Sequence, residues 1–121
     1  EYWNDDIVRM VTSIKPTVVL VQAPGQMILP WEPSPAAIAV AFLAGEETAH
    51  AWAGLLFGDY SPSGKLPVMF PASYSDQITP LAVDVPYSEG LFSSYRSKQF
   101  IPYYPFGHGL SFTGFEYGEP T

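Results

Sequence analysis

Cysteine is absent from this 121-residue chain, which excludes disulfide bonds and thiolate metal sites. Positive charge is also scarce, because five Lys and Arg residues face twelve Asp and Glu residues, for a formal net charge of −7. A protein that binds nucleic acid or an anionic membrane surface needs a basic patch that neutralises phosphates. We therefore expect neither partner, since the basic residues are scattered along the chain: Arg9, Lys15, Lys65, Arg96 and Lys98.

Long apolar runs are missing as well. No run approaches the roughly 20 residues that a membrane-spanning helix requires. The chain opens at Glu1 on a polar stretch, with neither an initiating Met nor a signal peptide, so we expect a fragment or a processed chain. Apolar residues nevertheless make up 47% of the sequence, which is enough for a chain of this length to fold as one domain.

The first predicted element is a helix. Asn4 is a typical N-cap residue, and Pro16 ends the helical pattern. Ile7, Val11 and Ile14 follow helical spacing and form an apolar stripe.

Two apolar runs then predict strands. Residues 17–21 and 37–43 are continuous and apolar, which is typical of strands buried on both faces of a parallel sheet. A third, shorter strand is predicted over residues 66–70, where it ends at Pro71.

A second helix is predicted between these strands, from Gly45 to a glycine C-cap at Gly58. Glu46 and Glu47 would occupy its first turn, where the helix dipole favours acidic side chains, and we prefer this role to a paired acid/base device. Its expected apolar stripe is Ala49, Trp52, Ala53 and Leu56. The order helix, strand, strand, helix, strand indicates an α/β fold with helices packed on a sheet.

The last third of the chain loses regular periodicity. Residues 72–105 are rich in Pro, Ser, Tyr and Gly and predict a long ordered loop anchored by aromatic side chains such as Tyr87 and Tyr95. A loop of this length in a small domain usually wraps another domain or serves function. Residues 110–117 alternate loosely and predict the start of an edge strand.

Four segments in a fixed order resemble the family 3 glycoside hydrolases. Residues 45–59 resemble the stretch in which Gly-Gln-Glu opens a helix that ends in Phe-Gly-Asp, with Glu46 in place of Gln. Residues 59–67 resemble its Asn-Pro-Ser-Gly-Lys-Leu-Pro turn, and residues 87–96 resemble its Tyr-x-Glu-Gly-x-x-x-Gly-Tyr-Arg segment, with Ser94 in place of Gly. Residues 104–117 resemble its Tyr-Pro-Phe-Gly-His-Gly-Leu-Ser-Tyr-Thr-x-Phe signature.

The resemblance implies a fold. It implies that residues 1–109 are part of the family's C-terminal α/β domain, a flavodoxin-like three-layer sandwich with a mostly parallel sheet. It also implies that residues 110–121 lead into a fibronectin type III-like domain.

The resemblance implies an activity as well. Family members hydrolyse terminal β-linked sugars with retention, which needs two carboxyl groups. In the family the nucleophile is an Asp on a preceding barrel domain, and the acid/base Glu lies in a loop upstream of the helix predicted here. We therefore expect no catalytic residue within this chain, which would support the barrel and form one wall of the cleft. The implied partners are a glycoside substrate and that barrel domain. The implied location is secreted, periplasmic or vacuolar.

Several side chains are candidates for a binding or structural role. Trp31, in a proline-rich loop, is the best candidate for a sugar contact, although such rings more often fill a core. Asp59 is expected to order the turn after the second helix through side-chain hydrogen bonds. Glu89 and Arg96 are expected to form an ion pair that fixes their loop. His108 is expected to be a hydrogen-bonded residue of a tight glycine turn.

No cofactor or metal is expected. His50 and His108 are far apart in sequence, and a metal site needs several ligands. No phosphate-binding loop follows either predicted strand, which argues against a flavodoxin-like cofactor binder. The alternative function that stays open is a non-catalytic carbohydrate-binding or scaffolding module with the same fold.

Overall fold

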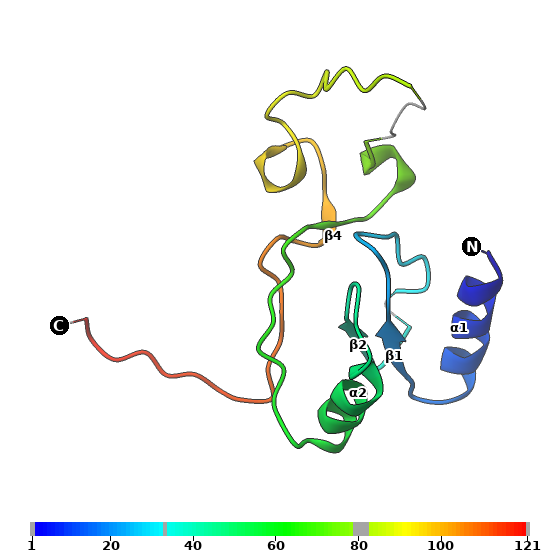
Figure 1. Cartoon of the computed structure of the whole chain (residues 1–121), viewed down its shortest axis with the longest axis vertical. Helices are drawn as coiled ribbons and strands as arrows, with labels where there is room; N and C mark the ends of the chain where they lie inside the picture. The colour runs from blue at the N-terminus through cyan, green and yellow to red at the C-terminus, as the bar shows by residue number, and fades with distance from the viewer. Residues whose placement is uncertain (1, 33, 79–82, 121) are drawn as a thin grey trace.

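The chain folds into a small α/β unit with two short sheets (Figure 1). The computed structural model describes residues 2–32, 34–78 and 83–120. Its elements are α1 (Tyr2–Ile14), β1 (Val18–Val21), β2 (Ala37–Val40), α2 (Thr48–Phe57), β3 (Phe70–Pro71) and β4 (Pro102–Tyr104). Two single 3-10 turns, η1 (Tyr74–Asp76) and η2 (Ser94–Arg96), lie between β3 and β4.

The first sheet consists of β1 and β2, which run parallel. Val18 lies opposite Ala37, and Val21 lies opposite Val40. Parallel neighbours need a connection of a dozen or more residues, and residues 22–36 provide it, with no helix among those of them that the structure describes. The predicted α/β class with a parallel strand pair is confirmed.

The second sheet is antiparallel and joins β3 to β4. Phe70 lies opposite Tyr104, and the register shifts at Pro71, which lies opposite Pro102. Prolines lack the N–H that a continuous ladder requires, so this sheet stays short.

The core lies where the two sheets and the β1–β2 loop meet. Its fully buried side chains come from β1, the loop and β3. Burial of each such large apolar side chain contributes about 1.5–3 kcal/mol to folding. The core residues are Val21, Leu29, Trp31 and Phe70.

Helix α1 differs from the prediction in its start and in its orientation. It begins at Tyr2, so Asn4 lies inside the helix and is not an N-cap. The apolar stripe of Ile7, Val11 and Ile14 is exposed, whereas Val8 packs on the core. The sequence showed the stripe but not the side of the helix that the rest of this chain covers.

Helix α2 is shorter than predicted. It begins at Thr48, and Glu47 occupies the N-cap position without a side-chain capping bond, so the two acidic residues precede the first turn. The predicted C-cap is confirmed, because Gly58 has φ 82° and its N–H bonds to the Gly54 carbonyl. A left-handed conformation of this kind favours glycine.

The buried side of α2 is also not the predicted one. Leu56 is exposed, whereas Gly54 is buried beneath the Tyr60 ring. Trp52 and Leu55 are half-buried. Because almost every residue of α2 is apolar, its sequence did not distinguish one face from another.

The later strands depart from the prediction as well. The strand predicted over residues 66–70 is β3 at Phe70–Pro71, and Leu66 instead pairs with the backbone near His108. Strand β2 ends at Val40 instead of residue 43. Residues 110–117 form no strand, because no neighbouring strand within the described residues is available to pair with them. Strand β4 was not predicted. It has only three residues, begins with Pro102 and is followed by Pro105, so it shows no alternation of polar and apolar side chains.

The described parts of the loop between β3 and β4, residues 72–78 and 83–101, are poorly buried. Tyr87 and Tyr95, which were predicted as anchors, are both exposed. Residues 79–82 of the predicted loop lie outside the described residues. Tyr95 does pack on Phe106, with ring centroids 4.7 Å apart. Within the described residues, neither helix has the length and hydropathy to cross a membrane.

The burial of Trp31 and the exposure of Trp3 predict different losses of stability when each is replaced by alanine. In the 121-residue chain, Trp31→Ala should lower the free energy of unfolding by about 3–5 kcal/mol, because Trp31 is only 4% exposed. Trp3→Ala is the matched control, since Trp3 is 82% exposed, and should cost less than about 0.5 kcal/mol. Urea unfolding followed by circular dichroism measures both values. Equal losses in the two variants would contradict this placement of the core.

Candidate functional site

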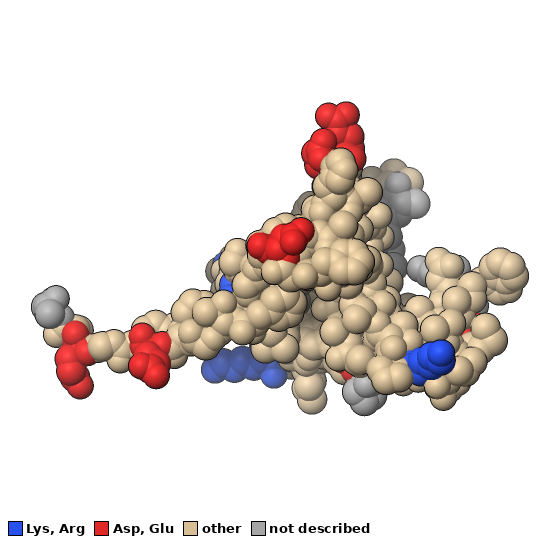
Figure 2. Space-filling view, turned by 90° about the horizontal axis from the view of Figure 1, so that it is seen from below, with Lys and Arg blue, Asp and Glu red and all other residues tan. Residues whose placement is uncertain are grey.

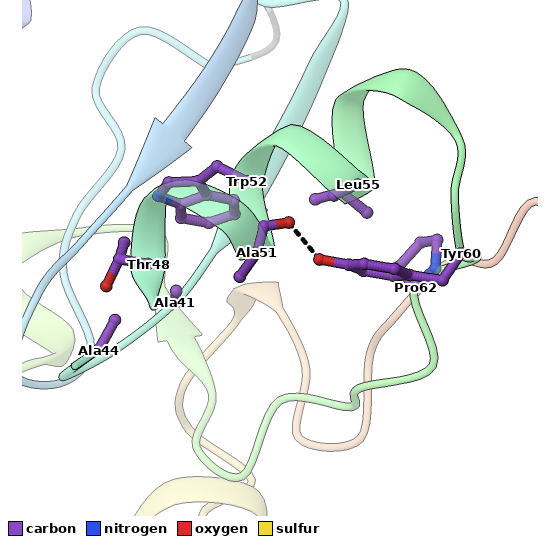
Figure 3. A pocket seen from close by; sticks show the side chains of 8 residues that line it. All are labelled: Ala41, Ala44, Thr48, Ala51, Trp52, Leu55, Tyr60 and Pro62. Atoms are coloured by element: carbon purple, nitrogen blue, oxygen red, sulfur yellow. Dashed lines mark hydrogen bonds between the residues drawn. The ribbon is translucent and has the colours of Figure 1, made fainter. Parts of the chain in front are cut away.

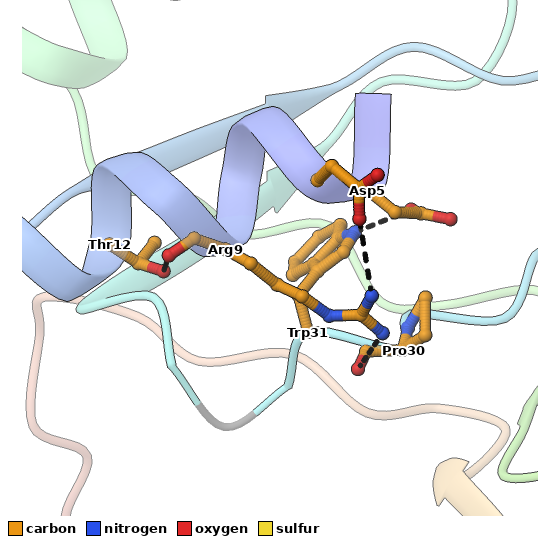
Figure 4. A network of polar contacts seen from close by, with 6 residues as sticks. Asp5, Arg9, Thr12, Pro30 and Trp31 are labelled. Carbon is orange, nitrogen blue, oxygen red and sulfur yellow. Dashed lines mark hydrogen bonds and ion pairs between the residues drawn. The ribbon is translucent and has the colours of Figure 1, made fainter. Parts of the chain in front are cut away.

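Trp31 is held by polar contacts from α1 (Figure 4). Its indole Nε1 donates to Asp5 Oδ1 at 2.9 Å, and Arg9 Nη2 donates to the Pro30 carbonyl at 3.1 Å. These contacts fasten the β1–β2 loop to the helix. Because the ring is buried on the core, it has no free face on which a sugar could stack, and the structure supports the core role for Trp31 instead of the sugar contact.

Glu32, next to Trp31, links the same loop to β4. The Tyr104 hydroxyl donates to Glu32 Oε1, and the Tyr103 hydroxyl donates to the Glu32 carbonyl at 3.2 Å. Glu32 Oε2 is buried and has no hydrogen-bond partner within the described residues. Desolvation, followed by the contact with Glu32, raises the pKa of Tyr104 well above its ordinary value near 10.

The resembling segments around residues 59–67 and 104–117 lie side by side. The Leu66 N–H donates to the His108 carbonyl at 2.8 Å, and the Gly107 N–H donates to the Leu66 carbonyl at 2.8 Å. Lys65 Nζ also donates to the Gly109 carbonyl. Ser61 completes this joint, because its hydroxyl accepts from the Phe112 N–H at 2.9 Å. We call this set of contacts the motif joint.

Gly109 is required by the close approach within the motif joint. A Cβ at this position would overlap the Gly64 carbonyl oxygen and lie 2.9 Å from Lys65 Cδ. Backbone atoms cannot yield as a flexible side chain can, so only glycine fits without a shift of the chain. His108 forms the turn through its backbone, since its N–H donates to the Pro105 carbonyl at 3.0 Å. Its ring packs on Tyr104 with centroids 4.9 Å apart. The predicted tight turn at His108 is therefore present.

The segment 87–96 does not contain the predicted ion pair. No salt bridge joins Glu89 to Arg96 within the described residues. The Arg96 guanidinium instead lies 6.0 Å from the centroid of the Tyr95 ring. The segment also contains a residue with a strained backbone. Ser94 has φ 50°, a left-handed conformation that costs L-residues about 1–2 kcal/mol. This is the position at which Ser replaces the Gly of the family pattern.

Asp59 also acts differently from the prediction. Its side chain makes no hydrogen bond to described residues, whereas its N–H donates to the Gly54 carbonyl at 2.9 Å. The backbone of Asp59 therefore ends α2, and its carboxylate is exposed. His50 is a surface residue, as predicted, and its Nδ1 lies 2.7 Å from Glu47 Oε2.

A shallow hollow of about 210 Å³ lies beside α2 (Figure 3). Tyr60 closes one side of it, and its hydroxyl donates to the Ala51 carbonyl. The lining is almost wholly apolar and carries no acidic side chain that could act on a glycosidic bond: Ala41, Ala44, Thr48, Ala51, Trp52, Leu55, Tyr60 and Pro62.

The described acidic side chains that bind the groups named above do so at separate places. Asp5, Glu32 and Glu47 each bind a non-acidic partner. Within the described ranges, no three His, Asp or Glu residues lie close enough together to hold a metal ion. Figure 2 shows the same dispersion on one face, where charged residues are few and separated by uncharged surface. Asp5, Glu32 and Glu47 thus take part in contacts that hold the fold.

Comparisons with known proteins identify the family of this domain. A family model described as the glycosyl hydrolase family 3 C-terminal domain matches residues 2–112. The crystal structure of a beta-D-glucoside glucohydrolase from Trichoderma reesei superimposes with a TM-score of 0.82 and 33% sequence identity, covering 95% of this chain and 17% of that one. The class is therefore the C-terminal α/β domain of a glycosyl hydrolase.

Two relatives carry β-glucosidase names. "Probable beta-glucosidase F" of Aspergillus fumigatus is 41% identical over 100 residues, which cover 74% of this chain and 12% of that protein. "Thermostable beta-glucosidase B" of Acetivibrio thermocellus is 36% identical over 122 residues, which cover 93% of this chain and 16% of that protein. The chain belongs to glycosyl hydrolase family 3, as its four motifs indicated, and it spans about one-eighth to one-sixth of the length of these relatives.

The motif joint predicts a specific glycine requirement. Gly109→Ala should lower the free energy of unfolding by about 1–3 kcal/mol, because the added methyl group overpacks against backbone. Gly114→Ala is the matched control, since its Cβ would meet nothing within 4 Å. Urea unfolding of both variants measures the difference. A loss no larger for Gly109→Ala than for Gly114→Ala would show that the two segments are not in close contact.

The Tyr104–Glu32 contact predicts a pH dependence. Because the folded state raises the pKa of Tyr104, the stability that its neutral form contributes is complete below pH about 10 and falls as the pH rises further. Tyr104→Phe should cost about 1–3 kcal/mol at neutral pH, because Glu32 Oε1 loses its donor. The difference between wild type and variant should shrink above pH about 10. Tyr117→Phe, at an exposed site, is the control, and a difference that grows with pH would contradict the assignment.

Proposed function

We propose that this chain is part of a retaining, exo-acting β-glycosidase that hydrolyses terminal β-linked sugars. The observation that carries the proposal is the match to the family's C-terminal domain over residues 2–112, together with relatives named as β-glucosidases. The segment would support a barrel domain elsewhere in the parent polypeptide and form one wall of its cleft. A glycoside is the substrate, reached through the parent enzyme.

The catalytic carboxylates are proposed to lie outside this chain. Retention requires two carboxyl groups about 5 Å apart, with one acting as nucleophile and the other as acid and base. The acidic residues with defined contacts are instead engaged with Trp31, Tyr104 and His50, which accounts for them as structural groups.

The connection beyond the motif joint is proposed to lead toward a fibronectin type III-like domain. Phe115 and Tyr117 lie on the C-terminal segment that projects from the rest of the chain in Figure 1, and both side chains are exposed. A following domain would cover these rings. The proposed location of the parent is secreted, periplasmic or vacuolar, which cell fractionation tests.

The isolated chain should not hydrolyse an aryl β-glucoside, whereas the parent polypeptide should. Within the parent, the amide variants Asp5→Asn, Glu32→Gln and Glu89→Gln should reduce kcat less than about tenfold. Removal of a true catalytic group typically costs about 10⁴-fold or more. Steady-state kinetics on the purified parent measures each effect. Turnover by the isolated chain that disappears in one of these variants would refute the placement of the catalytic pair.

A further inference from the structure

Glu32 has a buried carboxylate oxygen that no described residue satisfies. Its Oε1 accepts from the Tyr104 hydroxyl, and its backbone carbonyl accepts from the Tyr103 hydroxyl at 3.2 Å. Its Oε2 is buried and has no hydrogen-bond partner among the described residues. Buried polar atoms of proteins are in the great majority hydrogen-bonded, and an ionised group without partners is costly to bury. Oε2 therefore marks a place that a further donor fills.

The negative charge of Glu32 also lacks a positive partner. Two salt bridges are present among the described residues, and both lie elsewhere. The Tyr104 hydroxyl donates a hydrogen bond to the carboxylate but brings no charge. Buried charges in proteins are paired with an opposite charge or bound to a metal ion. The donor that meets Oε2 is therefore expected to be positively charged.

The Lys and Arg residues of this chain do not supply that charge. All five lie in the described segments, and none forms a salt bridge with Glu32. Arg9, on the helix that holds the same loop, binds the Pro30 carbonyl instead. The His108 ring packs on Tyr104 and likewise forms no salt bridge with Glu32. A counter-charge for Glu32 must come from another part of a longer polypeptide, and the net charge of −7 favours a basic partner.

The position of Glu32 lets a long side chain reach it. Glu32 as a whole is half-buried, and the Tyr103 side chain that binds its carbonyl is 40% exposed. The carboxylate therefore lies just beneath the surface, next to aromatic rings. Lys and Arg side chains lay their apolar stems on such surfaces and place the charged group at the end.

We propose that the carboxylate of Glu32 binds a Lys or Arg side chain from the part of the parent polypeptide outside residues 1–121. This ion pair would hold the β1–β2 loop and β4 against the neighbouring part of the parent. The inference rests on the proposed function only in requiring a longer parent, which fits relatives of whose length the matches cover 12% and 16%.

Other occupants satisfy the carboxylate less completely. A metal ion needs several ligands, and no three His, Asp or Glu residues of the described segments lie close enough together to hold one. A water molecule or a neutral donor would supply the missing hydrogen bond but leave the charge without a partner. A basic side chain provides the N–H group and the positive charge together.

A crystal structure of the parent polypeptide tests the inference directly. It should show a Lys or Arg nitrogen from outside residues 1–121 within about 3.2 Å of Glu32 Oε2. A water molecule, a metal ion, a neutral donor or no group at all at this distance would overturn the inference. A basic side chain from a second copy of the parent would overturn it as well.

A matched pair of variants in the parent measures the contribution of the ion pair. Glu32→Gln should accelerate thermal unfolding, followed by circular dichroism at a fixed temperature, at least about tenfold, because it leaves the basic group buried and unpaired. The amide oxygen can still accept from the Tyr104 hydroxyl, so that contact is kept. Glu46→Gln makes the same change at an exposed site and should leave the rate nearly unchanged. Equal rates in the two variants would contradict the ion pair.

A second substitution separates the ion pair from a packing role of Glu32. In the Glu32→Gln parent, replacing the basic residue found in the crystal structure by Met should slow unfolding again, because no unpaired charge then stays buried. Additive losses from the two substitutions would show that the two residues do not interact.

The outcomes separate this inference from the proposed function. A parent that hydrolyses an aryl β-glucoside but has only water at Oε2 would overturn the inference and leave the function intact. A basic side chain at Oε2 in an inactive parent would support the inference and count against the function.

Discussion

The parallel pairing of β1 with β2 is the constraint on which the remaining structure depends. Parallel strands cannot be joined by a tight turn, so a long loop must return from the end of β1 to the start of β2. That loop supplies Leu29 and Trp31 to the core, and it places Glu32 within reach of Tyr104. The second sheet is thereby attached to the first through the loop instead of through strand pairing. Without the parallel pair, the two ends of the loop would not be fixed, and Leu29 and Trp31 would not be held in the core.

The motif joint gives the family signature a physical meaning. Two segments that lie more than 40 residues apart form backbone hydrogen bonds with each other, and Gly109 permits the approach. The residues that identify the family in this part of the chain therefore connect two distant segments of the fold. This agrees with the environment of the acidic residues, which serve as hydrogen-bond partners of Trp31, Tyr104 and His50.

The sequence predicted local features well where one physical cause dominated. The β-branched run at β1, the apolar run at β2 and the glycine C-cap at Gly58 were all recognisable, because burial and left-handed backbone select few residue types. The hydrogen bond from Trp31 to Asp5 and the Tyr104–Glu32 contact could not be predicted, since both join residues far apart in sequence. The outward orientation of α1 was missed for a related reason. A stripe shows that a helix has an apolar face, but the partner of that face can lie in another part of the polypeptide.

The proposed role of this chain is to support a glycosidase whose reacting carboxylates lie elsewhere. A retaining enzyme passes through a covalent glycosyl-enzyme intermediate, so a slow fluorinated glycoside that traps this intermediate marks the nucleophile. Peptide mass spectrometry of the trapped parent polypeptide locates the label directly. We expect a single labelled Asp outside residues 1–121. A label on any Asp or Glu within this chain would contradict it.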